Sequence, residues 1–330
     1  MSTLAVSNPA YQYIQTIGNQ AGPPVPGFTG PVDVALGPEG LLYVLSDYYE
    51  FGVGQGKFVV RFNLDEDYLG AFGAYGTEDG EFTWPNSLAV DKEGNVHVTD
   101  EWLQQISVFD PEGNFRYKWG TEGDGDGQWN RPAGIVFNGE DNLLVVDSLN
   151  HRIQKFSGDG RFLDKWGGPG TGEGQFNMPW GITVDGLDNV YVADWRNDRI
   201  QKFDADGKFL LQFGATGEGD GQFNRPSGVG VDRDGYIYVV DWGNDRVQAF
   251  DPEGRFVTKF LGDCPGYSRW GVTRMASNPE NMAEQRLLVK DFGPEQRFFQ
   301  PTGIEVDSEN RIIIADTGRH RLQIYQKVSG

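Results

Sequence analysis

The sequence predicts an all-β protein, a six-bladed β-propeller in which each blade is an antiparallel sheet of four strands. Three observations lead to this fold class. One pattern recurs six times along the chain, each copy starts at a proline, and a complete copy holds four short runs of β-branched and aromatic residues. The two ends of the chain carry complementary parts of one copy. Copies of this length with four strands each are typical of propellers, whose blades bury their faces against one another.

A proline starts the first strand of each copy. From the second to the fifth copy the spacing is 47 residues throughout. The six anchoring prolines are Pro31, Pro85, Pro132, Pro179, Pro226 and Pro301. In the fourth copy the runs GITV, NVYVAD, RIQKF and KFLLQF are separated by the segments DGLD, WRND and DADG. Glycine and aspartate provide the positive-φ positions of tight hairpins, so each copy is expected to form one antiparallel sheet.

The chain termini are expected to close the ring. The sixth copy stops after its third run, RLQIY, and lacks an outer strand. The N-terminal segment YQYIQTIG, residues 11–18, has the pattern of the outer run RFLDKWG in the third copy. We therefore expect residues 11–18 to complete the last blade, which removes an open sheet edge. The whole chain, residues 1–330, is then a single domain.

Composition excludes several classes of partner. The 330 residues include 48 Asp and Glu against 28 Lys and Arg, a formal charge of −20. This charge repels phosphate backbones and anionic lipid headgroups, so we expect neither nucleic acid nor a membrane as partner. The single cysteine, Cys264, cannot form an internal disulfide, and neither a signal peptide nor a run of eighteen apolar residues is present. We expect a monomer in the cytoplasm.

The repeated pattern P-x-G-I-x-V-D-x-x-G-N-x-Y-V-A-D-x-x-N-x-R-I-Q-x-F-D resembles the NHL repeat over nearly the whole chain. The resemblance implies the propeller fold and leaves the function open, because propellers carry unrelated activities. Zinc-dependent lyases related to NHL propellers need several convergent histidines. This chain has His97, His151 and His320, and the last two fall in opposite blades. Zinc chemistry of that type is therefore not expected.

Most charged positions that recur are expected to be scaffold. An aspartate at the end of the second strand and an arginine five residues later recur as Asp147 and Arg152, Asp194 and Arg199, Asp241 and Arg246, and Asp316 and Arg321. We expect ion pairs within each blade. The loops GDGDGQW, GTGEGQF and GEGDGQF recur as turns between blades, so we expect no calcium there.

Two insertions interrupt the repeat on one face. The first is the ten-residue loop YYEFGVGQGK after Asp47, and the second spans residues 262–298 between blades five and six. Within the second, Asn278 is placed to cap a short helix starting near Pro279. Both leave from loops of the same propeller face in neighbouring blades, so we expect a lid over one side of the channel mouth. The alternative is a solvated decoration.

The same face is expected to bind the ligand. Aromatic residues and arginines occupy the slots around the anchoring prolines and after the second strand, where a concave mouth with a few polar groups would form. The candidate ligand-binding residues are Tyr48, Trp84, Asn86, Trp102, Arg131, Trp180, Trp195, Arg225, Trp242 and Trp270. The alternative is that several of these tryptophans only pack between blades.

Two carboxylates on channel-lining strands depart from the repeat. Blade one has Asp33 where blades three to six have glycine, and blade six has Glu305 in a slot that otherwise holds small residues. A close pair of carboxyl groups can act as acid and base, or can hold a cation or an arginine. The alternative is that both bind only water or backbone.

Two functions remain open at this point. The first is a propeller that binds a small molecule or peptide at the mouth, with no cofactor. The second is a hydrolase or lyase with Asp33 and Glu305 in its channel. The gluconolactonase-like propellers hold a channel calcium with Glu, Asn and Asp, and the strictosidine synthase-like propellers use a single Glu. Glu305, Asp33 and Asn86 are the residues that would take such parts, which leaves a divalent cation in the channel as an option.

Overall fold

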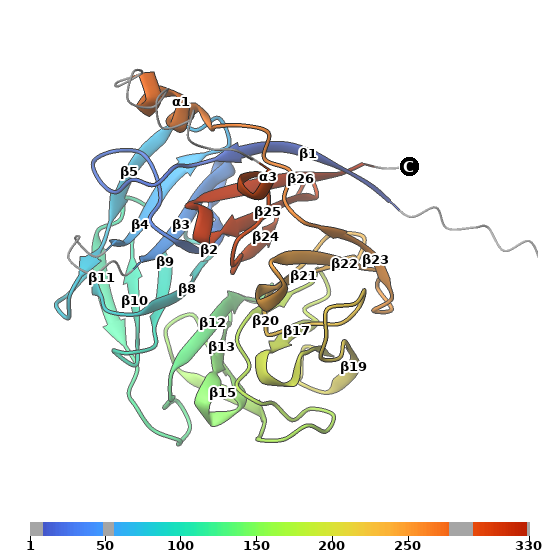
Figure 1. The fold of residues 1–330 in the computed structure, drawn as a ribbon. Helices are drawn as coiled ribbons and strands as arrows, with labels where there is room; N and C mark the ends of the chain where they lie inside the picture. Colours follow the sequence, from blue (N-terminus) through green and yellow to red (C-terminus); the bar gives the residue numbers. More distant parts are fainter. Residues whose placement is uncertain (1–8, 49–55, 277–292, 329–330) are drawn as a thin grey trace, which may run out of the picture.

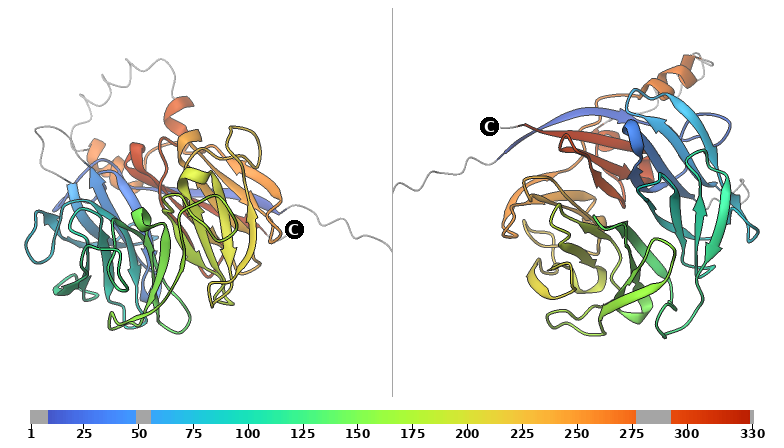
Figure 2. Two further views of the ribbon diagram at one scale, coloured as in Figure 1. Left: turned by 90° about the horizontal axis from the view of Figure 1, so that it is seen from below. Right: turned by 180° about the vertical axis from the view of Figure 1, so that it is seen from behind.

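The chain forms a ring of six four-stranded sheets around a central channel, as the computed structural model of the protein shows (Figure 1). The structure describes residues 9–48, 56–276 and 293–328. Figure 2 shows the ring from below and from behind, with the sheets arranged in sequence order around it. The predicted fold class is confirmed.

Each blade runs from an inner strand at the channel to an outer strand at the rim. Blade one contains β2 (Pro31–Leu36), β3 (Leu41–Tyr48), β4 (Gly56–Asn63) and β5 (Tyr68–Phe72). Blade two contains β8 (Pro85–Val90), β9 (Val96–Asp100), β10 (Gln105–Phe109) and β11 (Phe115–Trp119). Blade three contains β12 (Pro132–Phe137), β13 (Leu143–Asp147), β14 (Arg152–Phe156) and β15 (Phe162–Gly167). In blades four and five they are β16 (Ile182–Val184), β17 (Val190–Asp194), β18 (Arg199–Phe203) and β19 (Phe209–Phe213); β20 (Pro226–Val231), β21 (Ile237–Asp241), β22 (Arg246–Phe250) and β23 (Phe256–Phe260).

Blade six joins the two ends of the chain. Its order is β24 (Ile304–Val306), β25 (Arg311–Asp316), β26 (Arg321–Val328) and β1 (Ala10–Ile17). The N-terminal strand pairs antiparallel with the C-terminal one from Ala10 opposite Val328 to Ile17 opposite Leu322. The predicted closure is confirmed, with the strand one residue earlier than the expected range of 11–18.

The hydrophobic core is divided among the gaps between blades. In the gap between blades four and five, Phe223 is fully buried with Tyr191, Ile200 and Val239. The backbone of Gly214 lies so close to this ring that a Cβ atom would come 2.5 Å from Phe223, and its φ of +102° also favours glycine. Glycine at this position therefore serves the packing between blades as well as the turn.

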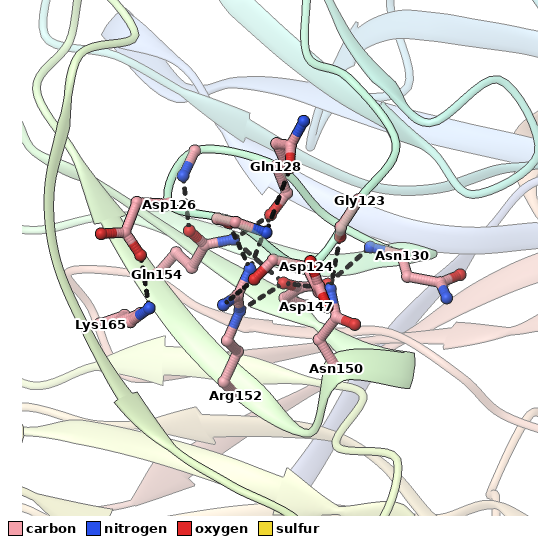
Figure 3. A network of polar contacts seen from close by, with 12 residues as sticks. Gly123, Asp124, Asp126, Gln128, Asn130, Asp147, Asn150, Arg152, Gln154 and Lys165 are labelled. Carbon is pink, nitrogen blue, oxygen red and sulfur yellow. Dashed lines mark hydrogen bonds and ion pairs between the residues drawn. The ribbon is translucent and has the colours of Figure 1, made fainter.

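A buried polar network secures each inter-blade loop to its blade (Figure 3). Asp147 is fully buried and accepts hydrogen bonds from the backbone N–H of Asn130 at 2.7 Å and from Arg152 Nε at 2.7 Å. The guanidinium of Arg152 also donates to the carbonyl oxygens of Asp124 and Gly125, both at 2.7 Å. The Gly-rich loop thus directs these carbonyl oxygens at an arginine.

The predicted ion pairs within the blades are confirmed. The N–O distance is 2.7 Å for Arg152 with Asp147, 2.9 Å for Arg199 with Asp194, and 2.7 Å for both Arg246 with Asp241 and Arg321 with Asp316. Blade one has the same pair in another form, because Asp47 lies opposite Lys57 in the strand register and pairs with it. Nine residues separate the two partners here, against four in the other blades, and this lengthened connection hides the pair in the sequence.

The second insertion contains helices at positions that the sequence did not indicate. Helix α1 spans Arg269–Ala276 and the short α3 spans Gly293–Gln296. The predicted helix start near Pro279 lies outside the described residues, as does most of the first insertion. In Figure 1, α1 lies at the rim of the ring beside blade one. Whether the insertion is a lid therefore stays a prediction. Within the described ranges, no helix is long and apolar enough to cross a bilayer.

Replacement of Asp147 by alanine is expected to lower the free energy of unfolding by about 3 kcal/mol or more, because it leaves a buried arginine without its partner. Lys165→Ala provides the control. It removes an ion pair with Asp126 in the same region, but both side chains are exposed, so a loss under about 1 kcal/mol is expected. Urea unfolding followed by circular dichroism measures both. Equal losses would show that the buried network does not secure the blade.

Candidate functional site

The centre of the ring contains a cavity of about 400 Å³. It is lined by the inner strands of all six blades, and its wall includes both Asp33 and Glu305. Trp84 and Trp180 also line it, from blades two and four. The predicted carboxylates and two of the predicted aromatic residues therefore share one cavity.

Glu305 is the one charged residue at its level of the inner strands. This level is the fourth residue after each anchoring proline. The six residues are Ala35, Ala89, Val136, Thr183, Gly230 and Glu305. In blades one and two the alanines are buried in the inter-blade core. Blade six places a carboxyl group in a slot that holds no charged residue in the other five blades.

Glu305 is half-buried and accepts one backbone hydrogen bond, from the N–H of Val306 at 2.9 Å. Burial raises its pKa to about 8, and the negative charges of Asp33 and Asp307 act in the same direction. A carboxyl group with this pKa is mostly protonated at neutral pH. It can then donate a hydrogen bond or a proton to a molecule in the channel.

Asp33 is held by three donors. Its Oδ2 accepts hydrogen bonds from Ser87 Oγ at 2.6 Å and from the Leu88 N–H at 3.1 Å, and its Oδ1 accepts one from the Val34 N–H at 3.0 Å. Burial raises the pKa of Asp33 to about 6, although these hydrogen bonds oppose the shift. Asp33 is therefore mostly ionised at neutral pH, when Glu305 is mostly protonated.

The slot of Asp33 is the place where neighbouring inner strands approach most closely. In blade four it holds Gly181, where a Cβ atom would come 2.3 Å from the carbonyl oxygen of Ser227 in blade five. Blades one and two have Asp33 and Ser87 there, and the two side chains bond to each other across the gap. Ser87 was missed in the sequence, although the same departure from glycine would have identified it.

Tryptophans at the mouth form two groups. Trp84 and Trp102 of blade two pack edge to face with ring centroids 5.0 Å apart, and they are 40% and 58% exposed. Trp180, Trp195 and Trp242 form a continuous run over blades four and five, with centroid separations of 5.2 and 5.4 Å. The first member of each group, Trp84 and Trp180, reaches the cavity.

Two acidic side chains of the cavity wall have cationic neighbours. Asp47 and Glu101 both line the cavity. Asp47 pairs with Lys57, which is fully buried. Burial raises the pKa of Glu101, and the positive charges of Arg131 and Lys57 oppose that shift. Each of these two carboxylates therefore has a cationic neighbour.

The remaining predicted residues are divided between mouth and scaffold. Asn86 lines the cavity, and Arg225 is exposed outside it. Tyr48 packs edge to face on His320, with ring centroids 5.1 Å apart. Trp270 does not belong to the mouth. It is buried against Phe28 and Phe62, and its Nε1 donates to the carbonyl oxygen of Glu66 at 2.8 Å. Its role is to attach α1 to the ring.

The two repeated histidines act as hydrogen-bond acceptors. His151 Nδ1 accepts the N–H of Met178 at 3.0 Å, and His320 Nδ1 accepts the N–H of Gly30 at 2.9 Å. Among the described residues no group of three His, Cys, Asp or Glu side chains is placed to hold a metal ion.

Comparison with known families identifies the repeat. A family model described as the NHL repeat matches residues 130–156, 176–203, 223–250 and 298–325, one stretch in each of blades three to six. The B-box type zinc finger protein ncl-1 from Caenorhabditis elegans is 40% identical over 47 residues, which is 14% of this chain and 6% of that protein. The chain therefore spans a small part of the curated relative it matches.

Solved structures share the fold. The virginiamycin B lyase from Staphylococcus aureus, in a structure with quinupristin, is 16% identical with a TM-score of 0.59, over 97% of this chain and 100% of that one. A gluconolactonase from Xanthomonas campestris is 15% identical with a TM-score of 0.60, over 91% of this chain and 87% of that one. At these identities the likeness shows the propeller fold alone.

Replacement of Glu305 by glutamine is expected to raise stability increasingly as the pH rises. Below the ordinary pKa of 4.5, Glu305 is protonated in both the folded and the unfolded protein. Between pH 4.5 and about 8 it ionises only in the unfolded protein, so the wild type loses stability as the pH rises across this window. Above about pH 8 the loss is complete, and at least about 1.4 kcal/mol should separate the two proteins. Urea unfolding at a series of pH values measures the difference. Glu309→Gln, an exposed change in the same blade, should follow the wild type. Parallel curves for Glu305→Gln and the wild type would contradict the raised pKa.

Proposed function

We propose that this chain, which belongs to the NHL-repeat β-propellers, binds a small molecule in its central channel. The ligand enters at the face that carries the tryptophans. One observation carries the proposal: Trp84 and Trp180 at the mouth and Asp33 and Glu305 deeper in the channel bound the same cavity. Its size lies in the range of ordinary ligand sites, and aromatic and carboxyl side chains from several blades converge on it.

The tryptophans and the carboxyl groups of the cavity wall have different roles in this proposal. The exposed indole faces at the mouth provide apolar contact area at low cost in conformational entropy. The carboxyl groups orient the ligand by hydrogen bonds in a partly desolvated space, where such bonds discriminate strongly between ligands. A peptide segment that inserts one side chain into the channel would use the same contacts. Nucleic acid is not proposed, since the channel wall and the chain as a whole are acidic.

A second candidate is an enzyme that uses the two carboxyl groups as acid and base. The observation that favours it is the separation of their pKa values, about 8 for Glu305 and about 6 for Asp33, which leaves one protonated and one ionised near pH 7. A lyase and a gluconolactonase share the fold, which makes hydrolysis or elimination the reaction types to test first. Asp33 is already bound by three donors, so Glu305 is the stronger candidate for proton transfer.

A thermal-shift screen of metabolites tests the binding proposal. Ligands of the channel are expected to raise the melting temperature of the wild type and to lose most of this effect in Trp180→Ala, because Trp180 forms part of the cavity wall. Tyr117→Ala is the control, since Tyr117 is exposed on the outer strand β11, far along the blade from the channel. Hits that respond equally to both variants would locate the site elsewhere and count against the channel.

Turnover tests the enzymatic alternative. If a hit from the screen is converted, Glu305→Gln is expected to lower kcat by about a hundredfold or more, as for the loss of a general acid, with little change in ligand affinity. Glu309→Gln should retain full activity. A converted ligand whose kcat is unchanged in Glu305→Gln would exclude Glu305 as the acid.

A further inference from the structure

The channel wall has an uneven charge balance. Its charged residues are Asp33, Asp47, Glu101 and Glu305, and no lysine, arginine or histidine lines it within the described part of the chain. Asp47 has Lys57 as partner, and Glu101 is influenced by both Arg131 and Lys57. Among the residues that the structure describes, Asp33 and Glu305, deeper in the channel, have no such cationic neighbour.

The groups around the deeper pair are acidic or neutral. The charges that act on Glu305 come from Asp33 on β2 and from Asp307 at the end of its own strand, and Asp307 is itself paired with Arg311. Asp33 has only the neutral donors Ser87, Val34 and Leu88. Ionised groups held away from bulk water are normally paired, because the unpaired charge is expensive. Without a cation in the channel Glu305 therefore stays mostly protonated at neutral pH, and a cationic ligand would supply the countercharge that stabilises its ionised form.

We propose, on the premise that the channel is the ligand site, that its ligand is a small aliphatic amine whose ammonium group lies at Glu305 and Asp33. An ammonium group has three N–H donors and no acceptor, which suits a wall of carboxylates. Within the described ranges Glu305 accepts one hydrogen bond, from a backbone N–H, so its carboxylate has acceptor sites available for such a donor. An anionic ligand would meet four carboxyl groups in this channel and is excluded.

A metal ion is a poorer fit than an amine. Calcium takes six to eight oxygen ligands, and magnesium demands near-octahedral geometry. The deeper channel offers two carboxyl groups, Glu305 at the fourth residue after its anchoring proline and Asp33 at the second, and Asp33 already accepts three hydrogen bonds. The other residues at the level of Glu305 are alanine, valine, threonine and glycine. A single ammonium group needs fewer oxygen ligands than either metal.

The tryptophans at the mouth are placed to contact the rest of such a ligand. Trp180 is the first residue after its anchoring proline and Glu305 is the fourth after its own, so the two levels differ by three residues, roughly 10 Å at ~3.3 Å per residue. An alkyl chain would lie along this length. A second ammonium group at its outer end would meet the indole faces of Trp84 and Trp180, which attract cations.

Isothermal titration calorimetry with three five-carbon probes tests the proposal on the intact protein. The probes are cadaverine, 1,5-pentanediol and glutarate, which have the same chain with cationic, neutral and anionic ends. At about pH 9, above the pKa of Glu305, cadaverine is expected to bind with one-to-one stoichiometry and at least about tenfold more tightly than the diol, and glutarate is expected not to bind. Equal affinities for the amine and the diol would overturn the proposal, as would no binding by cadaverine.

Two variants distinguish cadaverine binding in the channel from binding to the acidic surface, which attracts polyamines without specificity. Glu305→Gln is expected to weaken cadaverine binding by about tenfold or more, and Glu309→Gln is expected to leave it unchanged. In the wild type the affinity should fall by up to about tenfold per pH unit below the pKa of Glu305, because the amine binds the ionised form. Binding that responds equally to both variants would be surface binding and would overturn the proposal. Calcium chloride replaces cadaverine in a parallel titration, and tighter binding of calcium that depends on Glu305 would also overturn it.

These outcomes are distinct from failure of the proposed function. If neutral or anionic metabolites stabilise the wild type and lose this effect in Trp180→Ala, the channel is a ligand site and only the amine is wrong. If no compound in the metabolite screen depends on Trp180 and cadaverine does not bind, both proposals fail. Circular dichroism of each variant at the titration temperature confirms that a lost signal reflects lost binding rather than lost structure.

Discussion

One hydrogen bond recurs at five of the six junctions between blades in the described residues. The residue that precedes the third strand of a blade accepts, through its side chain, the backbone N–H of the residue that precedes the anchoring proline of the following blade. In the described residues these pairs are Gln104 with Arg131, His151 with Met178, Asp198 with Arg225, Asp245 with Gln300, and His320 with Gly30. Both partners of every pair have positive φ, which most residues avoid. The bond fixes two strained backbone positions at each junction and so sets the angle between blades.

This arrangement divides the residues of the mouth into a fixed backbone and variable side chains. The acceptor is glutamine, histidine or aspartate, since the junction needs only an acceptor atom at that place. The donor is a backbone N–H, so its own side chain is under no constraint and ranges from glycine to arginine. Blade two departs from the pattern, because the N–H of Trp84 bonds to Asp100 of its own blade. The residue at this departure is also one of the two tryptophans that reach the cavity.

The repeats explain how much of this structure could be predicted from the sequence. The four-strand pattern and the ion pairs recur in several copies, so each copy tests the interpretation of the others, and the ring closure follows from matching the two incomplete ends to that pattern. Asp33 and Glu305 were found because they break a repeated slot, and the structure places both in one cavity. Ser87 breaks the same slot as Asp33, and its importance appears only from its bond to the Asp33 carboxylate.

The insertion could not be predicted in the same way, because it occurs once and has no other copy for comparison. Nothing in the local sequence distinguishes Trp270 from the tryptophans of the mouth. Its burial depends on Phe28 and Phe62, which are more than 200 residues away in the chain, and on the carbonyl oxygen of Glu66. The ion pair of Asp47 and Lys57 was hidden for a related reason, since its two residues are separated by a loop of unique length.

The chemistry of the ring is concentrated at blades six, one and two, and the close approach of the inner strands explains why. In blades three to six glycine lets each inner strand contact the carbonyl oxygen of the next one, which leaves no room for a side chain. Blades one and two replace this glycine by Asp33 and Ser87, whose side chains fill and bond across the gap. Glu305 faces the same side of the channel from a slot that holds buried alanines in blades one and two. A carboxyl group at that slot costs stability through its desolvation, which its raised pKa records. An alanine there would complete the apolar packing as Ala35 and Ala89 do, so the scaffold does not require this carboxyl group. Because Glu305 lies in the cavity wall, we expect its role to be contact with a bound molecule.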